Sequence, residues 1–412
     1  MKVFQKPKSA MSTVPSVAPK TLNLWQCLRR RTPLGWLQLK HKKGQFIIAV
    51  SGVAFADILM LMQLGFQGAL FDSAVVLHSK LTADIFIISP QALNIGAMST
   101  FPRRRLYQAM DVTGVKSAEP MYVNLVTWKN PQTRDKKNLI IVGFNPDRPI
   151  FNLPEVNSQL AQVKQSDTLL FDRLAIGTYD KVVESVSNGK PVTTEIERRT
   201  VSVNGLFSIG SSFSADGHLM TSEDNYLRLF SRQSQGNINV GLIALKPGYD
   251  PAQVAQQLKA YLPKEGIKVL TRAEYIAFEQ GYWQQQTPIG PIFNLGAIMG
   301  FIVGVIIVYQ VLSTDVNAHL KEYATFKAMG YSNTYLLGIV FEEALILAIV
   351  GFIPGLIVSI GLYGVVGGAT NLPIAMTLVR ATQVLTGTLI MCMLSGAVAT
   401  GKVQAADPAD MF

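Results

Sequence analysis

The chain has 412 residues with a mean hydropathy of +0.26, and 49% of the residues are apolar whereas only 16% are charged. Because a soluble domain usually carries roughly a quarter charged residues, this composition argues against a soluble protein and indicates a membrane protein. The net charge of +10 lies within residues 1–45, which hold ten Lys or Arg residues and no Asp or Glu. A basic segment directly before a membrane span marks the cytoplasmic side, an interpretation that we favour over nucleic-acid binding.

Four apolar runs each come near the roughly 20 residues that a helix needs to cross a bilayer. We assign membrane helices to residues 46–66, 291–312, 335–361 and 381–401. With the basic cytoplasmic or interfacial segment 1–45 inside, the other segments are a cytoplasmic coupling helix 313–334, a periplasmic loop 362–380 and a cytoplasmic tail 402–412. The inner segments hold Lys321, Lys327 and Lys402, which agrees with this orientation. We therefore expect a multi-pass protein of the inner (plasma) membrane with both termini in the cytoplasm.

Residues 67–290 lie between the first two membrane helices and are predicted to form a large periplasmic α+β domain with a stalk. Asp250 before Pro251 is typical of a helix start, and Thr271 with Glu274 fits a capping box. We expect residues 67–82 to extend the first membrane helix and residues 271–290 to lead into the second. The expected strands are 83–89, 122–128, 139–144, 168–171, 193–197, 200–207, 238–245 and 267–270, and the expected helices are 102–110, 222–230, 251–261 and 272–283.

Three carboxylates lie inside the predicted membrane helices, where charge is costly and usually faces the protein interior. Asp57 is midway along the first helix. It could serve a proton relay or a substrate contact, or it could make an interhelical hydrogen bond or lie in a shifted span near the surface; we favour the structural alternatives. Glu342 and Glu343 are about 9 Å into the third helix. We expect both to reach the cytoplasmic surface and to hold the turn there.

Two Gly-x3-Gly pairs, Gly300 with Gly304 and Gly351 with Gly355, lie in the second and third membrane helices. This spacing lets membrane helices approach closely. It predicts tight helix packing and leaves self-dimerisation open.

The sequence offers no energy source or catalytic centre of its own. Gly396–Lys402 has the glycine spacing of a phosphate-binding loop, but Val403 follows where a magnesium-binding hydroxyl is needed, and the match lies at the end of a membrane helix. Cys27 and Cys392 and four scattered histidines fit no metal-ligand spacing. We therefore expect no catalytic residue, no metal and no cofactor bound by this chain, so it is not predicted to be an enzyme.

The order of one membrane helix, a large outer domain and three further helices resembles the MacB/FtsX class of ABC transporter permeases. The stretch from Glu322 to Gly330 resembles the cytoplasmic segment of that class, 341–355 its third membrane helix, and 406–410 its Asp-Pro-Ala ending. Further motifs resemble the DevC subfamily of cyanobacterial permeases, and the likeness runs from about Trp36 to Phe412. These motifs are residues 54–60, 63–66, 70–73, 128–133, 144–146 and 322–325.

The resemblance implies a transport subunit that works as a homodimer with a separate DevA-type ATPase, which holds ATP and Mg. It also implies a DevB-type membrane-fusion adaptor on the outer domain and a TolC-like outer-membrane channel. The exported substrate would be lipid-like, with an envelope glycolipid as one candidate. Glu322, Lys327, Ala328 and Gly330 would lie in the element that docks on the ATPase. ATP-driven closure of the cytoplasmic side would be relayed mechanically to the periplasmic domain.

Three alternatives remain. An FtsX-like regulator would use the same motion to activate a periplasmic cell-wall hydrolase, but the size of the outer domain and the DevC-type motifs argue against it. A membrane receptor would need a cytoplasmic output module, and no inner segment is long enough. A membrane-bound enzyme would need a nucleophile or metal motif, and the sequence shows none.

Overall fold

The computed structural model describes residues 43–233, 236–263, 265–370 and 372–405. The basic N-terminal segment up to residue 42 and the Asp-Pro-Ala ending at 406–410 lie outside the described residues. Within these described ranges, four helices are long and apolar enough to cross a membrane. They are α3 (Lys43–Ala74), α12 (Ile289–Ala318), α14 (Asn333–Thr370) and α15 (Leu378–Ala405).

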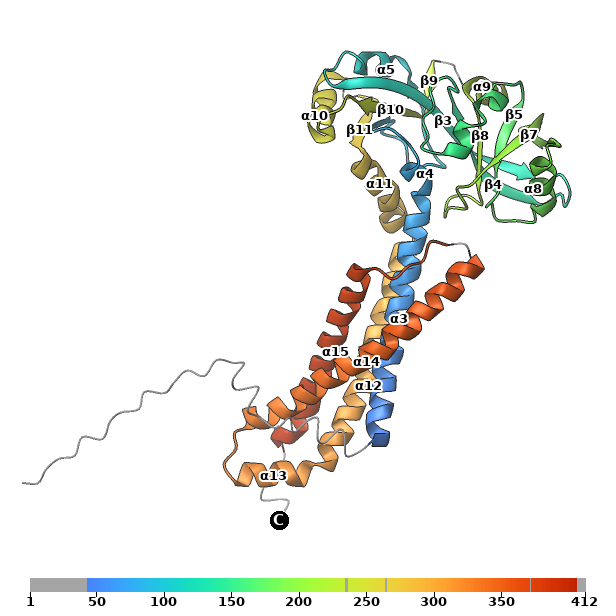
Figure 1. Ribbon diagram of the computed structural model, residues 1–412. Coiled ribbons are helices and arrows are strands. Elements are labelled where there is room, and N and C mark those ends of the chain that lie inside the picture. Colours follow the sequence, from blue (N-terminus) through green and yellow to red (C-terminus); the bar gives the residue numbers. More distant parts are fainter. Residues whose placement is uncertain (1–42, 234–235, 264, 371, 406–412) are drawn as a thin grey trace, which may run out of the picture.

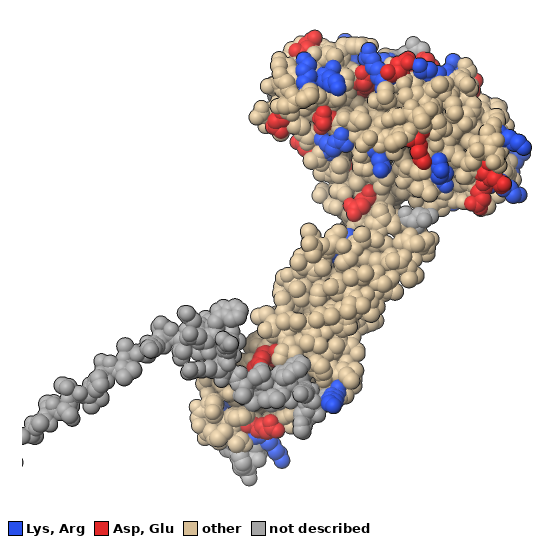
Figure 2. Space-filling model, in the orientation of Figure 1, with Lys and Arg blue, Asp and Glu red and all other residues tan. Residues whose placement is uncertain are grey.

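A separate domain of strands and short helices sits at one end of this helix bundle (Figure 1). We call residues 81–271 the extramembrane domain. It is inserted between α3 and α12, which confirms the predicted fold class of four transmembrane helices and one large α+β domain. Figure 2 shows that the visible face of the bundle is almost free of charged side chains, whereas the domain carries many of both signs. An uncharged surface of this length suits the hydrocarbon of a bilayer.

The helices extend beyond the predicted membrane spans. The span predicted at 46–66 is part of α3, which continues to Ala74 as the expected stalk and is followed after Val75 by the short α4 (Val76–Ser79). The loop predicted at 362–380 is too long at both ends, because α14 continues to Thr370 and α15 begins at Leu378. The glycines near the end of α14 do not interrupt it, since a helix in apolar surroundings must keep its own backbone hydrogen bonds.

The extramembrane domain is built on one mixed sheet of nine strands in the order β11-β1-β10-β3-β4-β8-β5-β7-β6. The strands are β1 (Ile85–Ile88), β3 (Val115–Lys129), β4 (Lys136–Phe144), β5 (Thr168–Asp172), β6 (Val192–Ile196), β7 (Arg199–Phe207), β8 (His218–Ser222), β10 (Val240–Leu245) and β11 (Lys268–Thr271). A two-stranded pair, β2 (Phe101–Pro102) with β9 (Asn237–Ile238), lies beside it. The long antiparallel pair of β3 and β4 joins the two halves of the sheet.

Helices cover both faces of this sheet, so several strands are buried on both sides. In β1, Ile85 and Ile87 face one core while Phe86 and Ile88 face the other, as strand alternation requires. The first core is covered by α5 (Arg104–Ala109), α8 (Asp180–Ser187), α9 (Glu223–Leu229) and α10 (Pro251–Tyr261). The second is covered by α4, α6 (Pro154–Asn157), α7 (Leu160–Val163) and α11 (Arg272–Gly281). Both helices that connect the domain to the membrane, α4 and α11, therefore pack on the same face.

Local signals placed several of these elements correctly. Asp250 caps α10 by accepting hydrogen bonds from the N–H groups of Ala252 and Gln253. Thr271 and Glu274 form the predicted capping box at the start of α11. The predicted helix 272–283 is different at its end, because a π-helix covers Tyr282–Gln286. The expected strand and helix sets lacked β8 and α8, whose sequences are short and mostly polar.

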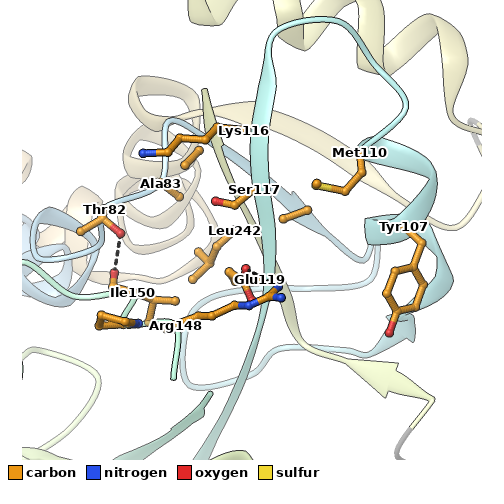
Figure 3. A pocket seen from close by; sticks show the side chains of 13 residues that line it. Thr82, Ala83, Tyr107, Met110, Lys116, Ser117, Glu119, Arg148, Ile150 and Leu242 are labelled. Atoms are coloured by element: carbon orange, nitrogen blue, oxygen red, sulfur yellow. Dashed lines mark hydrogen bonds and ion pairs between the residues drawn. The ribbon is translucent and has the colours of Figure 1, made fainter. Parts of the chain in front are cut away.

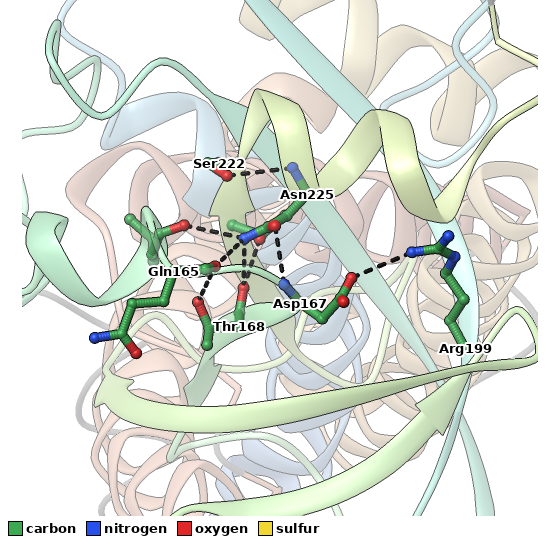
Figure 4. Close-up of polar contacts among 8 residues, drawn as sticks. Gln165, Asp167, Thr168, Arg199, Ser222 and Asn225 are labelled. Atoms are coloured by element: carbon green, nitrogen blue, oxygen red, sulfur yellow. Dashed lines mark hydrogen bonds and ion pairs between the residues drawn. The ribbon is translucent and has the colours of Figure 1, made fainter.

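A buried amide holds the second half of the domain together (Figure 4). Asn225 of α9 is 2% exposed, and its amide donates to the carbonyl oxygens of Gln165 at 2.8 Å and Thr168 at 3.3 Å. Its Oδ1 atom accepts a hydrogen bond from the N–H of Asp167 at 3.0 Å. The Asp167 carboxylate in turn pairs with Arg199 at 3.3 Å. These contacts fix the turn before β5, which has a positive φ of 54° at Asp167.

Candidate coupling site and its path to the extramembrane domain

The predicted coupling segment forms a separate helix, α13 (Leu320–Ala328), at the end of the bundle opposite the extramembrane domain (Figure 1). Tyr323 and Ala324 of α13 are buried, and Tyr323 packs in one cluster with Val316 of α12 and Val340 of α14. One residue, His319, separates α12 from α13. The short connection and this packing hold one face of α13 against both neighbouring helices.

Gly330 ends this helix in a conformation that favours glycine. Its φ of +90° lies in the left-handed region. The Gly330 N–H donates to the Lys327 carbonyl oxygen, and the Tyr331 N–H donates to the Phe326 carbonyl oxygen, both at 3.1 Å. The Phe326 and Tyr331 rings also contact each other, with centroids 5.6 Å apart. This is the Schellman arrangement of a helix end, and it gives the predicted role of Gly330 in ending the helix a physical basis.

The outward face of α13 carries the other residues that the sequence singled out. Glu322 and Ala328 are exposed, whereas Lys327 is half-buried. Sequence reasoning missed Met329 and Tyr331, which are 60% and 45% exposed just beyond the helix. Two large apolar side chains beside an exposed charge form a surface suited to a protein partner. The signal that could have found them is their position on either side of Gly330, the residue that ends the helix.

The four membrane-helix glycines pack against other helices of the same chain. A Cβ atom at Gly300 would lie 3.3 Å from Leu59 of α3, and one at Gly304 would collide with Met391 of α15. On the other side of α3, a Cβ atom at Gly351 would lie 2.6 Å from that of Val53, and one at Gly355 would lie 3.0 Å from that of Asp57. The glycines thus bring α12 and α14 close to α3, and these faces are occupied within the chain.

Asp57 lies in the middle of this packed region and is 0% exposed. The Thr388 hydroxyl of α15 donates a hydrogen bond to its Oδ1 atom. Its Oδ2 atom has no hydrogen-bond partner among the described residues. The structure therefore brings Asp57 together with an interhelical donor, which is the arrangement that sequence reasoning favoured.

The two glutamates of α14 have different surroundings, which corrects the expectation that both reach the surface. Glu342 is partly exposed, but Glu343 is 0% exposed and lines a small cavity with Asp315 of α12 and Phe46 of α3. Consecutive helix residues project about 100° apart. When one of this pair faces outward, the other must face the neighbouring helices.

At the domain end of the bundle, α14 and α15 are attached to α3 by contacts that the sequence did not reveal. The Tyr363 hydroxyl of α14 donates to the backbone carbonyl of Leu61 in α3. The Arg380 guanidinium of α15 lies over the Tyr363 ring, 5.9 Å from its centroid. Gly65 and Gly68 of α3 leave the space for these side chains, because a Cβ atom at either would collide with them. Movement of α14 or α15 is thereby linked to α3 below the domain.

Two connections join the bundle to the extramembrane domain. We call α4, which follows α3, the first link, and α11 with the π-helix Tyr282–Gln286, which precedes α12, the second link. Below them, the Gln67 amide of α3 donates to Asn294 Oδ1 of α12 at 3.0 Å. The Arg272 guanidinium at the start of the second link donates to the Ala83 carbonyl oxygen, just beyond the first link. One contact therefore joins the membrane helices just before the links, and another joins the second link to the domain just after the first link.

A hollow of about 500 Å³ lies on the domain where the chain leaves the first link (Figure 3). Thr82 lines it and donates to the Ile150 carbonyl oxygen at 3.0 Å. Glu119 of β3 pairs with Arg148 at 3.1 Å, and Lys116 also lines the hollow. The floor is apolar and includes Leu242 of β10. The hollow therefore combines charged and apolar side chains.

One family model matches part of the chain. Residues 294–408 match the family described as FtsX-like permease C-terminal, a range that begins within α12 and includes α13, α14 and α15. No curated protein matches the chain. Over this range the chain is similar to the C-terminal part of FtsX-like permeases, and the match includes three of the four helices that are long and apolar enough to cross a membrane among the described residues.

Three solved structures are similar to part of the chain. The periplasmic region of MacB from Actinobacillus actinomycetemcomitans is 10% identical, covering 48% of this chain and 92% of that one, with a TM-score of 0.33. The extracellular domain of the noncanonic ABC-type transporter YknZ from Gram-positive bacteria is 15% identical, covering 46% and 99%, with a TM-score of 0.30. A domain of a putative permease protein from Porphyromonas gingivalis is 13% identical, covering 47% and 88%, with a TM-score of 0.28.

Proposed function

We propose that this chain is the permease subunit of a tripartite ABC exporter of the DevC type. In this proposal α13 receives ATP-driven motion from a separate DevA-type ATPase, and the membrane helices relay that motion to the extramembrane domain. The domain lies in the periplasm and holds a DevB-type adaptor that leads to a TolC-like channel. The exported substrate is lipid-like, with an envelope glycolipid as one candidate.

The observation that carries the proposal is the geometry of α13. Its buried face, with Tyr323 and Ala324, packs on α12 and α14, while its other face presents Glu322 and Ala328 to the outside. The exposed Met329 adds apolar area next to this charge. A docked partner can therefore push on the outer face while the inner face transmits the force. The family match over residues 294–408 supports this assignment, because it includes the whole of α13.

The contacts along α3 support the relay. Gly300 and Gly355 bring α12 and α14 close to this helix, and α3 continues out of the bundle toward the first link. Helices packed this closely move as bodies rather than by gradual deformation. A homodimer would use the faces of the bundle that remain exposed, because both glycine pairs are occupied within the chain.

The direct test measures coupling in the reconstituted complex. We expect Glu322→Lys and Ala328→Trp to reduce permease-dependent ATPase stimulation and export by about tenfold or more, because each changes the docking face without touching the core. Glu184→Lys on α8 and Ala369→Trp at the opposite end of α14 are matched controls at exposed positions. If stimulation and export survive both α13 changes, α13 is not the docking element.

Orientation is tested separately. Lys321 is exposed on α13, so a cysteine placed there should react with a membrane-impermeant maleimide only after spheroplasts are permeabilised. Reaction in intact spheroplasts would place α13 outside the cytoplasm and rule out docking on an ATPase.

A further inference from the structure

A cluster of buried polar side chains lies where the two links meet. Glu279 of the second link is 0% exposed and His78 of the first link is 1% exposed. Buried carboxylates and imidazoles without full hydrogen bonding are costly. Their position at the only connections between the bundle and the domain among the described residues suggests a role in holding these parts together.

Glu279 fastens the second link to the extramembrane domain. Its Oε2 atom accepts a hydrogen bond from the Ile95 N–H at 2.8 Å, and Ile95 lies in the domain loop after β1. Its Oε1 atom accepts a hydrogen bond from the Trp283 indole N–H of the π-helix at 3.1 Å. The Trp283 ring also contacts the ring of Phe213, which lies in the turn between β7 and β8, with centroids 4.7 Å apart. One carboxylate thus connects the domain loop to the start of the helix that enters the membrane.

His78 stands beside this carboxylate without a hydrogen bond of its own. Its Nε2 atom is 3.7 Å from Glu279 Oε2, and neither ring nitrogen has a hydrogen-bond partner among the described residues. The ring lies against Tyr275, with centroids 4.5 Å apart. Burial, together with a smaller electrostatic effect of His218, lowers the pKa of His78 to about 3. The imidazole is therefore neutral near pH 7, so one of its nitrogens can accept a hydrogen bond.

The Oε2 atom of Glu279 can make either of two hydrogen bonds, depending on whether it carries a proton. As part of a carboxylate, it accepts the Ile95 N–H. If it carries a proton taken from solvent, it becomes a donor to which neutral His78, 3.7 Å away, offers an acceptor nitrogen, and it accepts the Ile95 N–H only weakly. Burial raises the pKa of Glu279 to about 7, so both forms are accessible near neutral pH.

We infer that Glu279 is a positioning residue that fastens the second link to the extramembrane domain. When its Oε2 atom carries a proton, the hydrogen bond with the Ile95 N–H is replaced by one to His78. In the ionised form the second link is fastened to the domain loop. In the protonated form the two links are fastened to each other and the loop is released. The use of this device in export depends on the proposed function, whereas the two contacts themselves do not.

Other titratable groups near the pair are few. Tyr275 comes from α11 itself and experiences the Glu279 charge, which together with burial raises the pKa of its phenol. His218 of β8 acts on His78. Lys268 of β11 lies over the Phe278 ring, 5.5 Å from its centroid. The proton that decides the contact is therefore assigned to Glu279, whose Oε2 atom bonds either Ile95 or His78.

The test measures amide hydrogen exchange of residues 89–98 in the full chain in lipid nanodiscs. Protection factors, which remove the intrinsic pH dependence of exchange, are compared at pH 6 and pH 8. We expect the wild type to be about tenfold more protected at pH 8, the effect of one charge-assisted hydrogen bond. Glu279→Gln imitates the protonated form, so residues 89–98 should show the lower protection factor, that of the wild type at pH 6, at both pH values. The exposed Glu184→Gln is the matched control and should follow the wild type.

A second variant keeps the inference testable if Glu279→Gln does not fold. His78→Phe removes the acceptor but keeps a ring against Tyr275, so residues 89–98 should lose much of their pH dependence. Equal protection of the wild type at both pH values, or unchanged pH dependence in His78→Phe, would overturn the inference. Neither measurement needs transport, so a failure here is distinct from a failure of Glu322→Lys to uncouple the ATPase.

Discussion

The stability of the extramembrane domain should depend on pH in opposite directions when one member of the Glu279–His78 pair is removed. Burial raises the pKa of Glu279 from its ordinary value of 4.5 to about 7. The folded state then binds a proton that the unfolded chain releases, so this group's contribution is present below pH 4.5 and is lost as the pH rises through 7. Burial lowers the pKa of His78 from 6.5 to about 3, so its contribution is present above pH 6.5 and is lost as the pH falls through 3.

As the pH rises from 4.5 to 6.5, the loss of stability due to Glu279 and the gain of stability due to His78 cancel in the wild type. One proton over two pH units corresponds to about 3 kcal/mol, since each unit of pKa is worth about 1.4 kcal/mol. We therefore expect His78→Phe to lose about 3 kcal/mol of domain stability as the pH rises over this window. Glu279→Gln should gain about 3 kcal/mol over the same window, because only the histidine still titrates.

Pulse proteolysis in urea on the full chain in nanodiscs measures this stability at each pH. The exposed Glu184→Gln is the control for the loss of one carboxylate, and its curve should run parallel to that of the wild type. Parallel curves for all four proteins would refute the reasoning, because they would show that neither buried group changes its proton binding on unfolding.

Two further predictions concern the helix bundle, and thermal unfolding in nanodiscs measures both. Thr388→Val removes the donor to the buried carboxylate of α3 and should lower the free energy of unfolding by about 1–3 kcal/mol. Thr386→Val is the control and should have no effect, because Thr386 is exposed and its hydroxyl bonds only to its own helix. Equal effects of the two variants would contradict the role of the interhelical bond. Gly355→Leu should separate α14 from α3, because a Cβ atom there lies 3.0 Å from a backbone oxygen of α3, and should cost about 1–3 kcal/mol. Gly361→Leu, where a Cβ atom meets nothing within 4 Å, is its control, and a tolerated Gly355→Leu would show that the close approach is not required.

The predictions that succeeded from the sequence rest on local chemistry. Asp250 caps α10 through its own side chain, and Gly330 ends α13 because the left-handed backbone there favours glycine. The membrane helices follow from long apolar runs, which need no knowledge of neighbouring elements. In each case the residues that set the structure are adjacent in the chain.

The burial and pairing of interior side chains could not be predicted without the tertiary structure. Glu342 and Glu343 are adjacent and chemically alike, yet only the packing of α14 against α3 and α12 decides which one is buried. The cluster of Glu279 and His78 joins residues about 200 positions apart, and neither lies in a recognisable motif.

The amino-acid sequence by itself determined the four membrane helices, the inserted α+β domain and the ends of several helices, because hydrophobicity and capping act within a few residues. The tertiary structure alone decided which polar groups are buried, which helices the glycines bring together and where the two links meet. Burial and pairing depend on surfaces brought together from distant parts of the chain, and no local pattern contains that information.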